Sequence, residues 1–466
     1  KRAEFNAATP NRFAFKHAHS ERNPEKDWDK HVLASIVFAL YALNDKFDGA
    51  AITPNNTIVI ASSVSNGGGA SLRAAELDQF GLIDGVAVSE PNVNPKPGAK
   101  FGIVQGLGAP FFAHSKDLYD YVTLVNLYQP CASVAQGAAA PLNLSASPNR
   151  CQSLADKGLL AAGTPSEQAN QAQAIINGYG ILPEQNFIQP SHTQFFVPQA
   201  ISVTYANAYG RFGVEDNLCG YSFGATAADG TPIPLAPTSL AILFALSNGI
   251  PPTGGVNLIN NLSVGGPRED RVSISASTNR QDQNVDGALC LRALSTGVEG
   301  AALNGNDQAN RAKVENGIKR ILANADLNGI PAIIVTGRND ANLAPNHTSR
   351  AYYGLNQLKH NDGKLRYVEI TNAHHLDVFN AFAGFDSRLI PLHYYFIQAL
   401  DLMYDHLKNG TPLPPSQVVH TTPRGAPMPP AIAAPQISTA NVPPIAQTPA
   451  AEDLIKFEDA TLKIPE

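Results

Sequence analysis

A strand, a tight turn and a helix near residue 60 constrain the fold most. Residues 57–62 are mostly β-branched and predict a strand, and residues 68–80 predict a helix. The small residues SVSNG at 63–67 join them, and the segment 85–89 predicts a second strand. Strands joined by one helix run parallel, because the crossover returns the chain to the same end of the sheet. We therefore expect a parallel α/β sheet.

The same rhythm of strands and helices occurs again much later in the chain. Further strands are predicted at 12–16, 331–336 and 365–370, and further helices at 27–44, 307–324, 347–360 and 392–408. We interpret residues 1–91 and 306–410 as the two parts of one α/β core.

Two segments differ from this core in composition. Residues 92–305 are rich in Gly, Pro, Asn, Ala and Gln, with helices predicted at 115–128, 237–247 and 286–296. Since this insertion leaves the sheet at the edge where α/β proteins bind ligands, we expect a mostly helical lid, with a separate domain beside the core as the alternative. Residues 411–466 hold 12 of the 35 prolines, which excludes a helix and predicts either a flexible linker or an extended arm packed on the core.

Ser65 lies at the tip of the predicted turn and is our candidate nucleophile. A sharp turn from strand to helix exposes this side chain at the carboxyl end of the sheet, and the N–H of Asn66 then faces the attacked group. Such a nucleophile elbow usually reads G-x-S-x-G, and here Ser63 replaces the first glycine. The alternatives are a loop without chemistry and Ser63 as the nucleophile.

A serine nucleophile needs a base and an acid that orients the base. In elbow-containing α/β folds they follow in the order serine, acid, histidine. Asp340 comes just after the strand predicted at 331–336, and TNAHHLD at 371–377 follows the strand predicted at 365–370. We therefore expect Asp340 to orient His375.

Each of these assignments has an alternative. His374 competes with His375 as the base. Asp340 is also a candidate helix cap. Asp377 is either a second partner of the histidine or, as we favour, a solvated loop charge.

Composition favours a globular protein. Of 466 residues, 44% are apolar and 15% charged, which suits a large core. The net charge of −6 argues against nucleic acid or an anionic membrane as partner. No apolar run approaches the ~20 residues that span a bilayer. We expect no cofactor, and the oligomeric state stays open.

The four cysteines are Cys131, Cys151, Cys219 and Cys290. They form no CxxC pair, so we expect no metal site of the zinc type. Two disulfides and four buried thiols are both open, and disulfides would indicate a secreted or periplasmic protein. Residues 282–287 match half of a calcium loop, but Ala293 stands where the loop needs glutamate, so we expect a turn that caps a helix.

Several segments resemble the D-(−)-3-hydroxybutyrate oligomer hydrolases. They are FAFKHAHS at 13–20, NPEKD at 23–27, SVSNGG at 63–68, the segment 340–350, and TNAHHLD at 371–377. These bacterial esterases cleave short oligomers released from poly(3-hydroxybutyrate) to monomers. The resemblance extends over most of the chain and implies the α/β-hydrolase fold.

The resemblance also implies roles for particular residues. Ser65 matches the family's nucleophile, His375 its base and, less specifically, Asp340 its acid, and family members are commonly exported. They have a longer N-terminal part, and the strands and the second oxyanion donor expected before the elbow are missing here. Asn66 remains as one donor; loss of the other would cost about 2.7–4 kcal/mol. Another carboxylesterase or serine peptidase, and a catalytically silent binding protein, are the competing functions.

Overall fold

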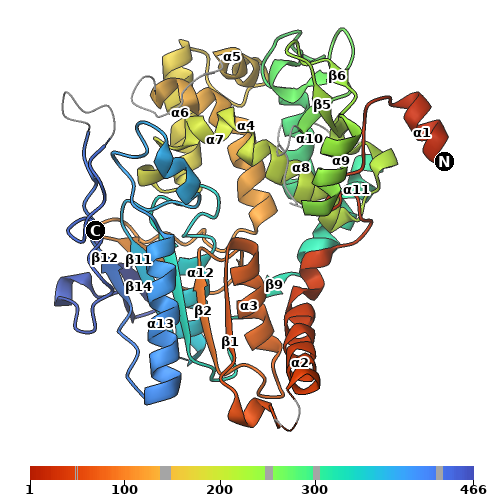
Figure 1. Cartoon of the computed structure of the whole chain (residues 1–466). Coiled ribbons are helices and arrows are strands. Elements are labelled where there is room, and N and C mark those ends of the chain that lie inside the picture. Colours follow the sequence, from red (N-terminus) through yellow and green to blue (C-terminus); the bar gives the residue numbers. More distant parts are fainter. Residues whose placement is uncertain are drawn as a thin grey trace. The chain divides into compact units, whose positions relative to one another are not determined.

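A computed structural model (Figure 1) describes residues 1–47, 49, 51–136, 148–246, 256–297, 305–360, 362–426 and 434–466. The chain divides into two compact units. Unit 1 comprises Lys1–Pro24, Tyr119–Tyr179 and Asn186–Arg320, and unit 2 comprises Glu25–Leu118, Gly180–Gln185 and Ile321–Glu466. The segment predicted as an insertion therefore contributes to both units.

Unit 2 is built on a five-stranded sheet with the order β1-β2-β10-β11-β12. Its strands are β1 (Ile60–Val64), β2 (Gly85–Ser89), β10 (Ala332–Gly337), β11 (Leu365–Ile370) and β12 (Gln417–Val419). Every pair of neighbouring strands is parallel, which confirms the predicted parallel sheet.

Helices cover both faces of this sheet (Figure 1). They are α2 (Trp28–Lys46), α3 (Ser65–Leu77), α12 (Ser349–His360) and α13 (His393–Asn409). Val86 and Val88 of β2 are buried in one cluster with Leu72 of α3, whereas Ala87 between them is buried in another with Met403 of α13. Successive residues of a strand point to opposite faces, so this sheet is apolar on both sides, as parallel sheets are.

The proline-rich segment after residue 410 packs on unit 2 as an extended arm. Its strand β12 extends the main sheet, while β13 (Lys456–Glu458) and β14 (Thr461–Ile464) form a second sheet with β4 (Gly102–Gln105). Val442, Ile445 and Leu462 of the arm are buried. Of the two alternatives, the packed arm is confirmed for the described residues. A separate short ladder joins β3 (Asn94–Pro95) to β9 (Leu322–Ala323).

Unit 1 combines helices with a small antiparallel sheet of order β6-β5-β7-β8. Its strands are β5 (Tyr221–Thr226), β6 (Pro232–Ile233), β7 (Asn257–Asn260) and β8 (Arg268–Glu269). The helices are α1 (Arg2–Ala8), α4 (Leu118–Gln136), α5 (Pro148–Asp156), α6 (Pro165–Gly178), α7 (Gln189–Gln194), α8 (Val197–Gly210), α9 (Pro237–Leu246), α10 (Val285–Thr296) and α11 (Gly305–Ile318). Among the described residues, no helix combines the length and apolarity needed to cross a bilayer.

Two disulfides cross-link unit 1. They join Cys131 to Cys151 and Cys219 to Cys290. Of the two interpretations of the cysteines, disulfides are therefore correct.

The strand predicted at residues 12–16 is wrong. Phe13 makes one backbone hydrogen bond, from its N–H to the carbonyl oxygen of Phe223 (3.2 Å), and no ladder follows. The guanidinium of Arg12 instead donates to the side-chain oxygen of Asn261 (2.9 Å). The segment therefore forms no strand, and the contact of Arg12 with Asn261 helps to hold it within unit 1.

Candidate active site

The turn between β1 and α3 is an elbow. β1 ends one residue before Ser65, whose φ of 53° lies in the left-handed region that residues other than glycine rarely adopt. A side chain on Gly67 would collide with the side chain of Ser63, and one on Gly69 with the backbone carbonyl of Asn92. The glycines after the serine therefore let α3 start close to β1 and to the segment that follows β2.

The structure brings Ser65, His375 and Asp340 together. The Oγ of Ser65 lies 2.9 Å from Nε2 of His375, and Nδ1 of His375 lies 2.9 Å from Oδ2 of Asp340. Ser65 follows β1, Asp340 follows β10 and His375 follows β11, so all three lie at the carboxyl edge of one sheet. When Nδ1 donates its proton to the carboxylate, Nε2 is left as an acceptor for the serine hydroxyl.

Backbone hydrogen bonds fix the acid. The Oδ1 of Asp340 accepts from the N–H groups of Asn342 (2.9 Å) and Leu343 (2.8 Å), which leaves Oδ2 for the histidine. The N–H of Asn339 donates to the carbonyl of Ala373 (2.9 Å), so the loops that carry acid and base are tied together. Helix α12 begins further along the chain, and Asp340 is therefore not its cap.

His374, the alternative base, has other partners. Its Nε2 lies 2.9 Å from Oδ1 of Asn380, and its ring stacks on Phe379 and Phe385. Burial lowers the pKa of His374 to about 4, so the ring is neutral at physiological pH. The two histidines thus have different surroundings, although they are neighbours in sequence.

The structure also shows the positions of Ser63 and Asp377, the remaining alternatives. Ser63 lies within β1, paired with Val88 of β2, and not at the turn. Asp377 accepts from the N–H groups of Leu392 and His393, both at 2.9 Å, and so caps the amino end of α13. The favoured interpretation of Asp377 as a solvated loop charge is therefore wrong.

Asn66 is the second residue of α3. The first N–H groups of a helix have no acceptor within the helix and carry its positive dipole end. The side-chain oxygen of Asn66 accepts from Nδ2 of Asn92 (2.9 Å), and the N–H of Asn92 donates to the carbonyl of Ser65 (2.8 Å). The elbow is thereby held against the segment that follows β2.

Charges around His375 make it a stronger base than free imidazole. Burial by itself would lower the pKa of His375, but the charge and hydrogen bond of Asp340 oppose burial, and the charges of Glu90 and Asp377 add to them. Together they raise the pKa to about 9. The site therefore stabilises the imidazolium that forms when the ring takes a proton.

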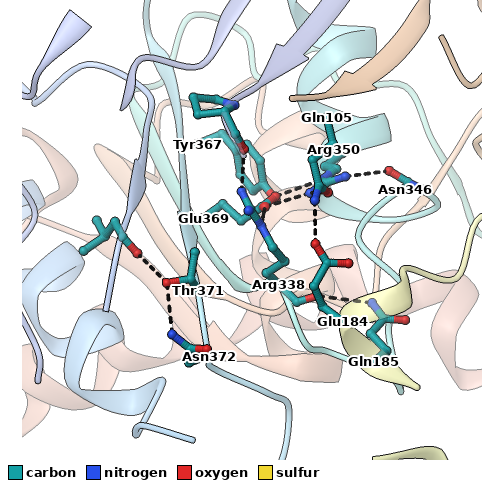
Figure 2. A network of polar contacts seen from close by, with 12 residues as sticks. Gln105, Glu184, Gln185, Arg338, Asn346, Arg350, Tyr367, Glu369, Thr371 and Asn372 are labelled. Atoms are coloured by element: carbon teal, nitrogen blue, oxygen red, sulfur yellow. Dashed lines mark hydrogen bonds and ion pairs between the residues drawn. The ribbon is translucent and has the colours of Figure 1, made fainter. Parts of the chain in front are cut away.

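A second group of buried charges lies next to the acid loop (Figure 2). The carboxylate of Glu369 accepts from Nε of Arg338 (2.6 Å), Nε of Arg350 (2.8 Å) and the hydroxyl of Tyr367 (2.7 Å). Arg338 also donates to the carbonyl of Pro465 (2.7 Å). These contacts join β10, β11, α12 and the end of the arm.

Sequence reasoning missed two buried acids, Glu90 and Glu369. Glu90 follows β2 directly, so the rule that selected Asp340 after β10 also applies to it. Glu369 lies within an otherwise apolar predicted strand, where a charge needs a buried partner. Both signals were present in the predicted strands.

In the part of the chain that the structure describes, no group of three or more His, Cys, Asp or Glu side chains is arranged so that it could hold a metal ion. In the half-match to a calcium loop, Asp282 accepts from the hydroxyls of Ser153 and Ser275, both at 2.6 Å. Asn284 accepts from the N–H of Gly287 (3.0 Å) at the start of α10. The predicted capping turn is confirmed.

Comparison with known proteins gives a consistent set of relatives. The family model described as 3HB-oligomer hydrolase (3HBOH) matches residues 1–466. The D-(−)-3-hydroxybutyrate oligomer hydrolase of Polaromonas naphthalenivorans is 48% identical over 482 residues, which cover 100% of this chain and 66% of the relative. Proteins of the same name from Albidiferax ferrireducens and Cupriavidus metallidurans are each 47% identical.

The alignments cover 100% and 99% of this chain and 66% and 64% of those two relatives. This chain thus spans just under two thirds of the length of these relatives. No solved structure matches. Because the family model covers the whole chain and the identities approach one half, the chain belongs to the 3HB-oligomer hydrolase family.

Proposed function

We propose that this chain is a serine esterase that hydrolyses short 3-hydroxybutyrate oligomers through an acyl-enzyme. The observation that carries the proposal is the chain of two hydrogen bonds, each of 2.9 Å, that joins Ser65 Oγ to the His375 ring and this ring to Asp340. The names of the relatives support the substrate class. Serine, histidine and buried carboxylate in this arrangement suit acyl transfer.

The first half of the reaction forms the acyl-enzyme. Nε2 of His375 takes the proton of Ser65 Oγ as this oxygen attacks the ester carbonyl carbon. The carbonyl becomes a tetrahedral oxyanion, towards which the N–H of Asn66 is a donor. The C–O bond to the leaving alcohol then breaks, and the imidazolium gives its proton to the departing oxygen, which leaves as the 3-hydroxyl group of the released fragment.

The second half returns the free enzyme. His375 takes a proton from water, and the resulting hydroxide attacks the acyl carbon of the Ser65 ester. When the second tetrahedral intermediate collapses, Ser65 recovers its proton from His375 and the free acid departs. Throughout the reaction, Asp340 holds the imidazole in the tautomer with the proton on Nδ1.

The fold and its lid form part of the proposal. The parallel sheet, the elbow after β1 and the order serine, acid, histidine support an α/β-hydrolase fold. In addition, we propose that the insertion acts as a lid. A roofed apolar pocket favours short soluble oligomers over a solid polymer. Comparable hydrolysis of crystalline polymer and of soluble trimer would argue against the lid.

We also propose that the protein is exported. The two disulfides support this, because such bonds persist mainly in secreted and periplasmic proteins. Cell fractionation of a producing bacterium tests it, and recovery of the native protein in the cytoplasm with all four thiols reduced would contradict it.

The experiment that tests the function combines substrates with two serine variants. Hydroxybutyrate dimers and trimers, p-nitrophenyl esters and peptides are offered to the wild type, Ser65→Ala and Ser63→Ala. We expect turnover of the oligomers, its loss in Ser65→Ala and its retention in Ser63→Ala, with fluorophosphonate labelling lost only in Ser65→Ala. Preference for peptides or for other esters would indicate a serine peptidase or another carboxylesterase. An inert wild type would indicate a binding protein.

A further inference from the structure

Glu90 lies in the same row of the sheet as the catalytic serine. Ser89, the last residue of β2, pairs with Val64 on one side and with Val335 on the other. One residue beyond the end of each strand, the chain reaches Ser65 after β1 and Glu90 after β2. Because β2 lies between β1 and β10, Glu90 stands between the strands that carry the nucleophile and the acid.

The backbone holds Glu90 there. Its N–H donates to the carbonyl of Val335 (2.8 Å), and its φ of 31° is in the left-handed region that side chains disfavour. Outliers of this kind collect at functional sites, where the surrounding structure maintains them. Ser65, the neighbouring residue in the row, has the same type of backbone conformation.

The carboxylate of Glu90 is buried and has an unusual set of partners. The side chain is 7% exposed and accepts a hydrogen bond from the hydroxyl of Ser89. Among the described residues, no lysine or arginine is one of the charges that act most on it. The one cation among the charges that act most on it is the protonated ring of His375.

We propose that Glu90 is a second carboxylate for His375, a positioning residue whose negative charge joins that of Asp340 in stabilising the imidazolium formed during each proton transfer. The inference rests on the proposed function, since it assigns Glu90 to the base of that reaction. Glu90 does not touch the reacting atoms and exchanges no proton with substrate in this role.

The groups that face Glu90 make its charge dependent on pH. Burial raises the pKa of Glu90 to about 7, against which the charge of His375 and the hydrogen bond from Ser89 act, while Asp340 and Asp377 raise it further. Glu90 is therefore ionised in mildly alkaline solution, where His375 loses its proton and can act as a base. At acid pH, Glu90 and His375 are both protonated, and Glu90 no longer stabilises the imidazolium by its charge.

The test is the pH profile of kcat/KM for Glu90→Gln and Glu90→Asp. Removing a negative charge from beside an imidazolium lowers the pKa of that imidazolium. We expect the acidic limb of the Glu90→Gln profile to move to lower pH by about one unit, with a plateau reduced about tenfold. Glu90→Asp should return the limb towards that of the wild type. A Glu90→Gln limb that stays in place or moves to higher pH would overturn the inference.

Glu76→Gln is the matched control. Glu76 is a buried acid of the same unit that accepts from the N–H groups of Asn324 (3.0 Å) and Ala325 (2.7 Å) and from the hydroxyl of Tyr352 (2.9 Å). It is not among the charges that act most on His375. Its loss can lower stability but should leave the limb in place.

Two further measurements keep the inference testable. If Glu90→Gln does not fold, Ser89→Ala removes the donor to the carboxylate and so raises the pKa of Glu90, and it should move the limb in the same direction by less. An NMR titration of the His375 ring needs no turnover. An unchanged titration in Glu90→Gln overturns the inference even in an inactive protein, whereas an inactive wild type with the expected shift overturns only the esterase function.

Discussion

Two groups of buried charges lie near the carboxyl edge of the same sheet, and they differ in their cation. The arginine cluster consists of Glu369 with Arg338 and Arg350. The histidine cluster consists of His375 with Asp340 and Glu90, of which Asp340 is in direct contact. The carboxylates of both clusters, Glu90, Asp340 and Glu369, are buried. They lie on or just after β2, β10 and β11, which are consecutive strands of the sheet.

The cation decides what each cluster can do. Guanidinium groups stay protonated, so the arginine cluster has one charge state at all ordinary pH values. Burial would raise the pKa of Glu369, but Arg350 and Arg338 lower it to about 2. An imidazole, in contrast, gains and loses a proton near neutrality. The first cluster therefore suits a structural role and the second a catalytic one, although both are built from buried carboxylates.

Replacing the cation of the histidine cluster should have the largest effect. We expect His375→Ala to lower kcat for oligomer hydrolysis on the order of 10⁶-fold, because the serine loses its base. His374→Ala should lose stability, since the buried ring packs against Phe379 and Phe385, while its folded molecules stay active. Steady-state kinetics and thermal melting distinguish the two variants. A larger loss of kcat in His374→Ala than in His375→Ala would assign the role of base to His374.

The acid of the histidine cluster should matter less than the base. Asp340→Asn keeps an oxygen for the N–H groups of Asn342 and Leu343 but no longer holds the proton on Nδ1 of His375. We expect kcat to fall about 10⁴-fold, as for a triad that holds the wrong tautomer. Activity within tenfold of the wild type at its optimum would show that another group, with Glu90 the first candidate, orients the ring.

The arginine cluster should instead respond in stability. Glu369→Gln removes the carboxylate that pairs with both Arg338 and Arg350, and breaking a buried pair in this way costs about 3–5 kcal/mol. Urea unfolding measures the loss, and fluorophosphonate labelling of the remaining folded protein should persist. The matched control is Glu458→Gln, whose carboxylate pairs with Lys463 on the surface and whose unfolding midpoint should not move. A large loss of labelling without a loss of stability would place Glu369 in the chemistry.

Much of the histidine cluster could be predicted from sequence, for a physical reason. In a parallel sheet all strands end at one edge, so Ser65 and Asp340 follow from the position of each strand alone. The choice between His374 and His375 does not follow in this way. It depends on how the loop turns after β11, where Asn372 adopts a φ of 55°, and on the apolar pocket that receives His374.

Other features depended on contacts between residues far apart in the chain. The disulfide partners of Cys131 and Cys219 lie 20 and 71 residues away, and spacing does not distinguish the possible pairings. The arm was predicted as one of two alternatives, because proline excludes helix but not packing. The rule that selected Asp340 also applies to Glu90, but the interaction of Glu90 with His375 is seen only in the folded structure.

The smallest expected effect is a difference in pH dependence between the two clusters. The charges around His375 raise its pKa above 6.5, so the neutral ring needed as a base is lost as the pH falls through the raised value. We expect kcat/KM to fall about tenfold per pH unit on this limb, which should lie above pH 6.5. A limb at or below 6.5 would show that the carboxylates do not act on the ring.

The arginine cluster should show no change over the same range. Glu369 has a pKa lowered from 4.5, so the stability that it contributes is present above pH 4.5 and is lost only as the pH falls towards 2. The stability difference between wild type and Glu369→Gln should therefore be constant from pH 5 to 8, whereas kcat/KM of the wild type changes across part of this interval. Urea unfolding and kinetics at matched pH values test both statements together. A stability difference that follows the activity limb would mean that the two clusters titrate as one, and that the arginines do not hold Glu369 in a single charge state.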